Sequence, residues 1–200
     1  PIKYRRVRDD MAALIEAVRR AAAESDLVTI IAGSSAGEHD LTAEVVAEAG
    51  ELLAHGIDVM PGKPAVLGKV DGKPFLGVPG YPVSAIVIAR EILRPAVEKF
   101  LGSSARAYPS VRATVPKKIA SHLGLEEFIR VTLGRVGEKV VAVPLARGAG
   151  VITTMVHADG LMRIPSLVEG LNAGEQIDVE LLRPLEDIEN TILCTGSHDL

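Results

Sequence analysis

Residues 61–85 read PGKPAVLGKVDGKPFLGVPGYPVSA, and this stretch decides the fold of the first half of the chain. Its Asp71-Gly72 pair favours a tight hairpin turn between two apolar runs. The second run ends at Pro79, and a helical pattern over 81–102 follows at once. A strand that leads directly into a helix indicates an α/β sheet.

The same alternation extends toward the N-terminus. An amphipathic helical pattern covers residues 9–24, a short β-branched apolar run covers 27–33, and a second helical pattern covers 41–49. Residues 52–60, LLAHGIDVM, have the composition of one further strand. The alternation predicts an α/β domain with a mainly parallel sheet to which a hairpin is added.

The helix over 81–102 contains two prolines with different expected effects. Pro82 lies in the first turn, where a missing N–H costs nothing, because the first N–H groups of a helix have no partner there. Pro95 lies in the interior and is expected to kink or divide the helix.

The pattern of apolar residues along the sequence changes near residues 103–108. From 108 to 184 short apolar runs alternate with Gly and Pro, which predicts a small all-β, barrel-like domain. An acidic lead-in and an apolar run, TILCT, then follow like the start of another domain. We therefore expect domains at 1–104 and 105–185, and the truncated start of a third at 186–200.

Composition excludes several functional classes. The chain has 200 residues, 48% of them hydrophobic, and a net charge of −4, so it is expected to fold and to bind neither nucleic acid nor membrane. No apolar run approaches the ~18 residues that a membrane span needs. A single cysteine, Cys194, fits a reducing compartment and a cytoplasmic location.

Small, hydroxylated and acidic residues follow the apolar run at 27–33. Glycine and serine at the start of a helix can bind a phosphate, and two carboxylates can hold Mg²⁺. The alternative is a plain turn in which Asp40 caps the helix. The candidate phosphate ligands are Gly33, Ser34, Ser35 and Gly37, and the candidate metal ligands are Glu38 and Asp40.

A second candidate turn lies at the end of the quoted stretch. Pro79, Gly80, Pro82 and Ser84 surround the start of a helix, where an anion could bind. The alternative is a rigid turn with proline at the first helical position.

Two further charged positions are candidates. Lys63 stands between Gly62 and Pro64 and follows Pro61, so its ammonium could be aimed at an anionic ligand, although an exposed turn is the alternative. Asp10 opens the first helix, where an acid is also favoured by the helix dipole alone. The five histidines have no metal-ligand spacing.

Four stretches taken together resemble one known family. They are VRDD at 7–10, SDLVTIIAG at 25–33, GSSAGEHDLT at 33–42, and HGIDVMPGKPAVLGKVDGKPFLGVPGYPVSA at 55–85. They look like the molybdopterin-binding domain of the MoeA-type molybdopterin molybdotransferases, a domain that gephyrin also contains. The resemblance implies a three-layer domain that is incomplete at its N-terminus here. The β half is similar to that family's C-terminal barrel-like domain, and the tail resembles the start of a periplasmic-binding-protein-like domain.

The resemblance implies a function as well. Members of this family insert molybdate into adenylylated molybdopterin and release AMP. By analogy the loop 33–37 and the turn 79–84, with Pro61 and Gly62, would hold the substrate, and Glu38 and Asp40 would place Mg²⁺ and molybdate. Lys63 and Asp10 would act in catalysis together with Glu38 and Asp40. A homodimer and a molybdopterin adenylyltransferase are the implied protein partners.

The chain also departs from the family pattern. Most bacterial members have Gly-Gly-Val-Ser where this chain has Gly33-Ser34-Ser35-Ala36, and asparagine where it has Tyr81. Two other functions therefore stay open. One is a molybdopterin adenylyltransferase-like enzyme, against which the long β half argues. The other is a non-catalytic module that binds a pterin or an oxyanion and has a regulatory role.

Overall fold

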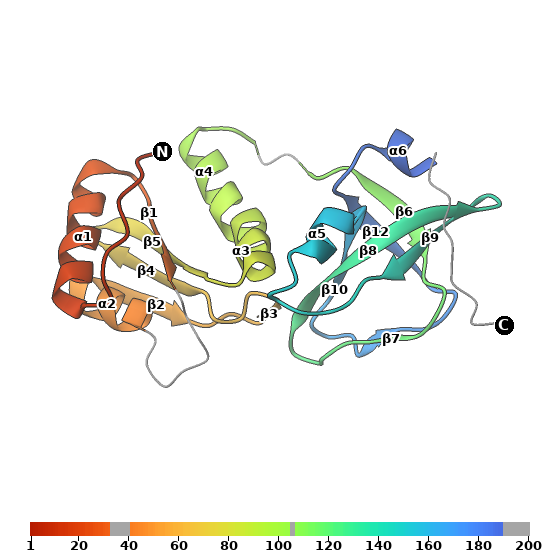
Figure 1. The fold of residues 1–200 in the computed structure, drawn as a ribbon, viewed down its shortest axis with the longest axis horizontal. Helices are drawn as coiled ribbons and strands as arrows, with labels where there is room; N and C mark the ends of the chain where they lie inside the picture. The colour runs from red at the N-terminus through yellow and green to blue at the C-terminus, as the bar shows by residue number, and fades with distance from the viewer. Residues whose placement is uncertain (33–40, 105–106, 190–200) are drawn as a thin grey trace. The chain divides into compact units, whose positions relative to one another are not determined.

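The computed structural model describes residues 1–32, 41–104 and 107–189. The chain forms two compact units, shown in Figure 1. The first comprises Pro1–Ile57 and Gly62–Ser104, and the second comprises Asp58–Pro61 and the chain from Ala105 onward. Four residues that the sequence assigned to the first domain, 58–61, thus belong to the second unit.

The first unit is built around a sheet with strand order β1-β5-β4-β2. Strand β1 (Val28–Ala32) pairs in parallel with β5 (Lys73–Pro79). Strand β4 (Val66–Val70) pairs antiparallel with β5 and with β2 (Glu51–His55). The expected mainly parallel sheet is therefore not confirmed: among the described strands of this sheet only β1 and β5 pair in parallel, because the hairpin supplies β4 and β2 joins its far edge.

Helices cover both faces of this sheet (Figure 1). Helices α1 (Met11–Glu24) and α2 (Leu41–Ala49) pack on one face, where Val18, Val46 and Phe75 share a core. On the other face, Leu76, Val78 and Ile88 form a second core. Their alternation along β5 explains the layering, since successive residues of a strand point to opposite faces.

The helix expected over 81–102 is divided, as Pro95 predicts. It consists of α3 (Pro82–Ile88), a π-helical turn η1 (Ala89–Leu93) and α4 (Arg94–Phe100). Pro95 lies in the first turn of α4, where its missing N–H is tolerated. The π-turn just before it absorbs the disturbed hydrogen bonding, which is a usual cause of a break in a helix.

The hairpin turn is confirmed. Asp71 and Gly72 have φ values of 49° and 74°, and they join β4 to β5. Two residues with positive φ are the geometry of a type I′ turn, whose twist matches that of the two strands.

The single strand expected over 52–60 is wrong. The chain leaves β2 at His55, turns at Gly56 with φ of 88°, and forms a separate strand β3 (Val59–Met60). Strand β3 pairs in parallel with β8 of the second unit. One apolar run thus supplies strands to two different sheets, which its composition alone cannot show.

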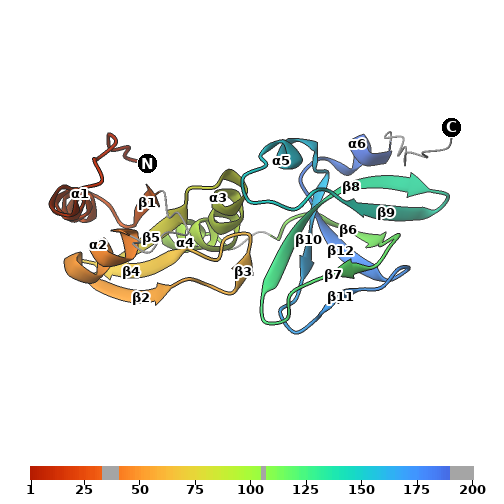
Figure 2. The ribbon, with the colours of Figure 1, turned by 60° about the horizontal axis from the view of Figure 1, so that its bottom comes forward.

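The second unit is a small β-barrel (Figure 2). Its strands are β6 (Ser110–Thr114), β8 (Glu126–Val136), β9 (Lys139–Pro144), β10 (Gly160–Ile164) and β12 (Gln176–Leu181). Strand β10 pairs with both β12 and β8, which closes the order β10-β12-β6-β9-β8 into a ring. A short ladder joins β7 (Ile119–Ala120) to β11 (Gly170–Leu171). The barrel-like fold predicted for this half is confirmed.

Two short helices modify the all-β prediction. Helix α5 (Thr153–His157) lies between β9 and β10, and α6 (Leu185–Glu189) follows β12. Ile188 of α6 is buried in the core of the barrel, so this part of the tail packs with the second unit. The expected strand TILCT and Cys194 lie outside the described residues.

Candidate functional site at the carboxyl edge of the first sheet

Two adjacent parallel strands end side by side in the first unit. Ala32, the last residue of β1, is the register partner of Pro79, the last residue of β5. The chain therefore leaves the sheet at one edge, the carboxyl edge, toward both turns that the sequence singled out. Ligands of open α/β sheets bind beyond such strand ends.

The first turn itself lies outside the described residues. The sequence placed six candidate ligands there, and their predicted roles in binding phosphate and Mg²⁺ stay predictions. These residues are Gly33, Ser34, Ser35, Gly37, Glu38 and Asp40.

Lys63 reaches the same edge because it precedes β4, the first strand of the predicted hairpin. Strand β4 runs antiparallel to β5 and starts with Val66 opposite Gly77, so the residues before Val66 enter at the carboxyl edge. The turn is held by the Ala65 N–H, which donates to the Gly62 carbonyl at 3.1 Å, and by the Ile57 N–H, which donates to the Lys63 carbonyl at 2.9 Å. The Lys63 side chain is exposed to solvent.

The Gly62 backbone is compatible with this tight turn. Gly62 is buried and has φ of 137°, a conformation that other residues rarely adopt. Pro61, predicted to bind the same ligand, is grouped with the second unit. The register of β4 places Gly62 and Lys63 at the edge, and Pro61 directly precedes them in the chain.

The turn at 79–84 is a rigid start to a helix. Pro79 is buried, Gly80 and Tyr81 are exposed, and Pro82 is the first residue of α3. The Tyr81 carbonyl accepts a hydrogen bond from the Ala85 N–H at 2.9 Å. This geometry matches the rigid-turn alternative and also leaves the Gly80 backbone open to a ligand.

Ser84 differs from the other residues of that turn. It is only 2% exposed, because it sits on the face of α3 that is covered by protein. Its predicted part in binding is untested, but its burial gives it a packing role in any case.

Asp10 has a clear structural use. Its Oδ1 accepts a hydrogen bond from the Ala13 N–H at 2.9 Å, and its extended backbone is that of an N-cap. Helix α1 leads directly into β1 and so runs against it, which brings the start of α1 toward the carboxyl edge (Figure 1). The catalytic role predicted for Asp10 stays a prediction.

A cavity of about 720 Å³ lies beside β1. It is bounded by the N-terminal segment, α1, β1 and the first residues of α2, and its lining includes Asp9, Ile31 and Thr42. Its size is within the range of small-molecule sites in proteins. The cavity extends to the carboxyl end of β1 and so adjoins the candidate edge.

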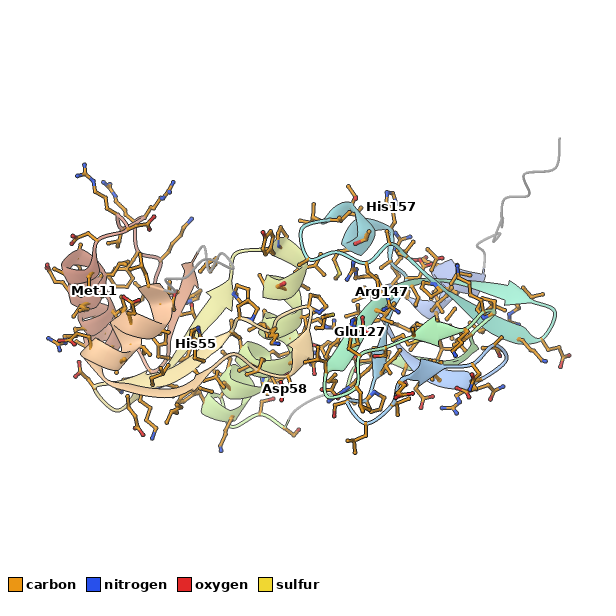
Figure 3. The ribbon with its side chains drawn as sticks, turned by 90° about the horizontal axis from the view of Figure 1, so that it is seen from below. Met11, His55, Asp58, Glu127, Arg147 and His157 are labelled. Carbon is orange, nitrogen blue, oxygen red and sulfur yellow. The ribbon has the colours of Figure 1, made fainter. Side chains whose placement is uncertain are left out.

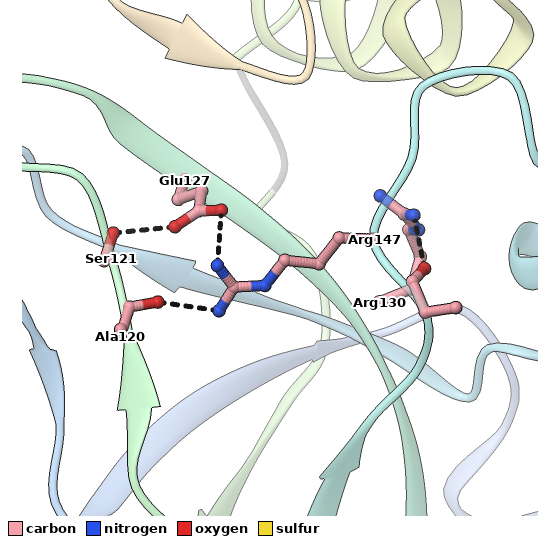
Figure 4. A network of polar contacts seen from close by, with 6 residues as sticks. Ala120, Ser121, Glu127, Arg130 and Arg147 are labelled. Carbon is pink, nitrogen blue, oxygen red and sulfur yellow. Dashed lines mark hydrogen bonds and ion pairs between the residues drawn. The ribbon is translucent and has the colours of Figure 1, made fainter.

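The structure also shows a polar network in the second unit that sequence reasoning missed (Figure 4). Arg147 Nη1 donates to Glu127 Oε1 at 3.1 Å, and the Ser121 hydroxyl donates to Glu127 Oε2 at 2.8 Å. Arg147 Nη2 also donates to the Ala120 carbonyl at 2.7 Å. Figure 3 shows Glu127 and Arg147 close together, and Glu127 is buried.

Arg130 anchors a loop in the same unit. It is 3% exposed, and its guanidinium donates to Thr154 Oγ1 and to the carbonyls of Ala146 and Gly148. Burial lowers the pKa of Arg130, and the charge of Arg147 lowers it further. One indication of this anchor is present in the sequence, because Arg130 lies inside the apolar run FIRV. A charged residue in a buried strand must form hydrogen bonds or ion pairs with the protein.

Asp159 completes this set of buried charges. Its Oδ2 accepts a hydrogen bond from the Leu133 N–H at 2.9 Å, and Arg183 Nη1 lies 3.6 Å from its Oδ1. All these bonds join strands and loops of the barrel to one another, so we assign the buried charges of the second unit to structure.

The described ranges contain neither a candidate metal cluster nor a candidate membrane-spanning helix. Residues 1–32, 41–104 and 107–189 contain no group of three or more His, Cys, Asp or Glu side chains placed to hold a metal ion. None of the helices in those ranges is long and apolar enough to cross a membrane.

The fold is an α/β unit with a candidate ligand site at its carboxyl edge, followed by a β-barrel, and comparison with known families gives this class its identity. Residues 1–99 match the family described as "Probable molybdopterin binding domain", and residues 112–182 match the "MoeA C-terminal region (domain IV)". With both domains present in this order, the chain belongs to the MoeA-type molybdopterin molybdotransferase family.

Individual relatives agree with this assignment. A Methanocaldococcus jannaschii protein named for molybdopterin biosynthesis is 35% identical over 181 residues, which are 90% of this chain and 42% of that protein. A molybdopterin molybdenumtransferase of Staphylococcus epidermidis is 27% identical over 95% of this chain and 46% of its own length. The chain thus spans less than half the length of these curated relatives.

Solved structures show the same fold. The molybdopterin biosynthesis MoeA protein of Pyrococcus horikoshii superposes with a TM-score of 0.69 at 34% identity, over 88% of this chain and 42% of that chain. A molybdenum cofactor biosynthesis protein of Pyrococcus furiosus gives a TM-score of 0.71 at 29% identity, over 90% of this chain and 58% of that chain.

Proposed function

We propose that the protein is a molybdopterin molybdotransferase that inserts molybdate into adenylylated molybdopterin and releases AMP. The main support for this proposal is the arrangement of residues at the carboxyl edge of the first sheet. Two neighbouring parallel strands end there at Ala32 and Pro79, and Lys63 enters at the same edge. Relatives that match 95% and 86% of this chain are named molybdopterin molybdenumtransferase, which supports the proposal.

The residues at the edge supply the binding chemistry. The exposed ammonium of Lys63 is a point charge for an anionic substrate. The open backbone at Gly80 allows a ligand to approach closely. In this proposal the loop that follows Ala32 binds the phosphate groups with its glycine and serine residues.

The donor set predicted from the sequence fits Mg²⁺. This ion is usually held by one or two carboxylates together with substrate phosphates, and Glu38 and Asp40 are two such carboxylates in the loop after β1. When bound, Mg²⁺ would neutralise charge on the phosphate groups. Glu38 and Asp40 would orient the ion and a water molecule.

The proposal also covers the oligomeric state, the partner enzyme and the cellular location of the protein. We infer a homodimer whose active site is completed by the partner subunit, with the molybdopterin adenylyltransferase as the supplier of substrate. A cytoplasmic location is part of the proposal and rests on the single cysteine. So is the start of a binding-protein-like domain in the tail, which the sequence placed at 186–200 and which is now proposed only after Glu189, because α6 packs with the second unit.

Two other functions make different predictions. A molybdopterin adenylyltransferase has no evident use for the closed barrel that follows the first unit. A non-catalytic regulatory module is favoured by Tyr81 and by the altered loop Ser34-Ser35-Ala36. Such a module would bind the pterin or the oxyanion without turnover.

A complementation assay separates these functions. The full-length gene is introduced into a strain that lacks its molybdotransferase, and molybdoenzyme activity is measured. We expect rescue, and we expect Asp40→Asn to abolish it at unchanged protein stability, because Asn caps a helix as well as Asp but lacks the charge that Mg²⁺ needs.

The matched control is Glu48→Gln, an exposed acid later in α2, which should rescue like the unmodified protein. Failure of the unmodified protein, when it is expressed and folded, would contradict the proposed activity. Rescue by Asp40→Asn would contradict the metal assignment alone.

A further inference from the structure

We propose that Tyr81 is a stacking platform for the aromatic ring of the ligand at the carboxyl edge, an inference that rests on the proposed function. The chain contains only three tyrosines, three phenylalanines and no tryptophan. Such scarce aromatic side chains are expected to be used in the core. Tyr81 and Phe100 are instead 53% and 54% exposed, and of these two Tyr81 is the one that directly follows the end of β5.

The position of Tyr81 relative to the edge follows from the strand register. It is separated only by Gly80 from Pro79, which pairs with Ala32 at the carboxyl ends of the two parallel strands. Lys63 enters the sheet at the same edge and belongs to the same unit. One edge therefore carries an exposed aromatic ring and an exposed cation.

The backbone around Tyr81 is fixed, although its ring is exposed. Its φ and ψ are −71° and 128°, Pro82 follows it, and its carbonyl accepts the Ala85 N–H. The ring belongs to neither of the core clusters of the first unit. A held backbone lowers the entropy that binding must overcome, and a ring outside the core is available to a ligand.

The exposed ring of Tyr81 and the exposed ammonium of Lys63 together favour one class of ligand. An aromatic face stacks on any planar heterocycle, and an ammonium attracts a phosphate. A molecule with a planar ring and phosphate groups satisfies both at once. Adenylylated molybdopterin contains two such rings, the pterin and the adenine, together with phosphate groups between them.

The test is a set of dissociation constants for adenylylated molybdopterin and the full-length protein, measured by calorimetry. Tyr81→Ala removes the ring and should weaken binding by about 5- to 100-fold, the range for loss of one stacked aromatic residue. Tyr81→Phe keeps the ring and should bind within about two-fold of the unmodified protein.

Phe100→Ala is the matched control. Phe100 is the last residue of α4 and is 54% exposed, so the same kind of side chain is removed far along the helical segment from the edge. Its removal should leave the dissociation constant unchanged. Equal weakening by Phe100→Ala and Tyr81→Ala would overturn the platform, because the effect would not depend on the edge.

Titrations with AMP alone and with molybdopterin alone identify the stacked ring. The ring that stacks on Tyr81 is the one whose fragment loses affinity in Tyr81→Ala. Normal binding of both fragments and of the whole ligand by Tyr81→Ala would overturn the platform and leave the proposed function intact. Failure of the unmodified protein to bind adenylylated molybdopterin would overturn both.

Discussion

The buried charged side chains of the second unit contrast with the exposed Lys63 of the first. In the second unit Glu127, Arg130 and Asp159 are buried, and each is hydrogen-bonded to strands or loops of the barrel. In the first unit Lys63 is exposed at the carboxyl edge. Buried charges need hydrogen bonds or ion pairs within the protein, whereas an exposed charge at a strand end is accessible to a ligand.

The comparison shows why burial and charge alone do not identify a site. The network around Arg130 is the most conspicuous polar feature of the described chain, yet its bonds end on the protein itself. At the carboxyl edge, by contrast, the side chain of Lys63 is exposed to solvent. The following predictions test this division, beginning with the largest expected effect.

Arg130→Ala should destabilise the second unit by about 3 kcal/mol, because three charge-assisted hydrogen bonds of a buried guanidinium are lost. Amide hydrogen exchange should accelerate in β8 and stay unchanged in β5. Arg112→Ala, which removes an exposed ion pair with Asp178, is the control and should cost about 0.5 kcal/mol or less. Slow exchange in β8 of the Arg130 variant would contradict its structural assignment.

Gly77→Ala should destabilise the first unit by about 1–3 kcal/mol, the usual cost of overpacking a core. A Cβ at this position would lie 2.7 Å from Thr42 Cγ2 and 2.9 Å from Val66 Cβ. The added methyl group would push α2 away from the sheet. Hydrogen exchange should accelerate in β5 and not in β8. Faster exchange in both units would contradict the separate treatment of the two units.

Asp10→Ala should cost about 1 kcal/mol through loss of the cap on α1, and Asp10→Asn only a few tenths, since Asn caps about as well. Thermal unfolding of the two variants measures this difference. AMP release by Asp10→Asn then separates the cap from the chemistry. A large fall in rate at unchanged stability would identify the catalytic role that the sequence predicted.

The smallest expected effect is the pH dependence of a turn in the barrel. Glu175 accepts hydrogen bonds from the Asn172 side chain and backbone N–H, and these bonds lower its pKa below the usual 4.5. The stabilisation is therefore present above pH 4.5 and is lost as the pH falls through the lower folded pKa. An NMR titration should give Glu175 a midpoint below that of an unpaired glutamate, and a midpoint at or above it would contradict the turn.

Much of the fold follows from local sequence. Asp71-Gly72 predicted the hairpin because few residue pairs accept two positive φ values, and Pro95 predicted the division of the helix because proline lacks an N–H. The run 52–60 was mistaken for one strand because its destination depends on long-range pairing of β3 with β8. Composition does not contain that information.

The site was predictable only in part. A glycine-rich turn after an apolar run marks a strand end in the sequence, and the register of β1 and β5 places two such ends together. The place of Lys63 depends on the antiparallel direction of β4, which the predicted hairpin at Asp71-Gly72 already implies. The network around Arg130 was missed because its partners come from loops far apart in sequence.

The most direct test of the central claim compares two lysines at opposite ends of β4. Lys63 precedes the strand at the carboxyl edge, and Lys69 near its other end forms an exposed 3.4 Å ion pair with Glu51. The measurement is kcat/KM for AMP release from adenylylated molybdopterin by the full-length protein. We predict a loss of about 100-fold for Lys63→Gln, typical for removal of one electrostatic contact to a reacting anion, and no change for Lys69→Gln. Equal rates for the two variants would contradict the assignment of the carboxyl edge as the active site.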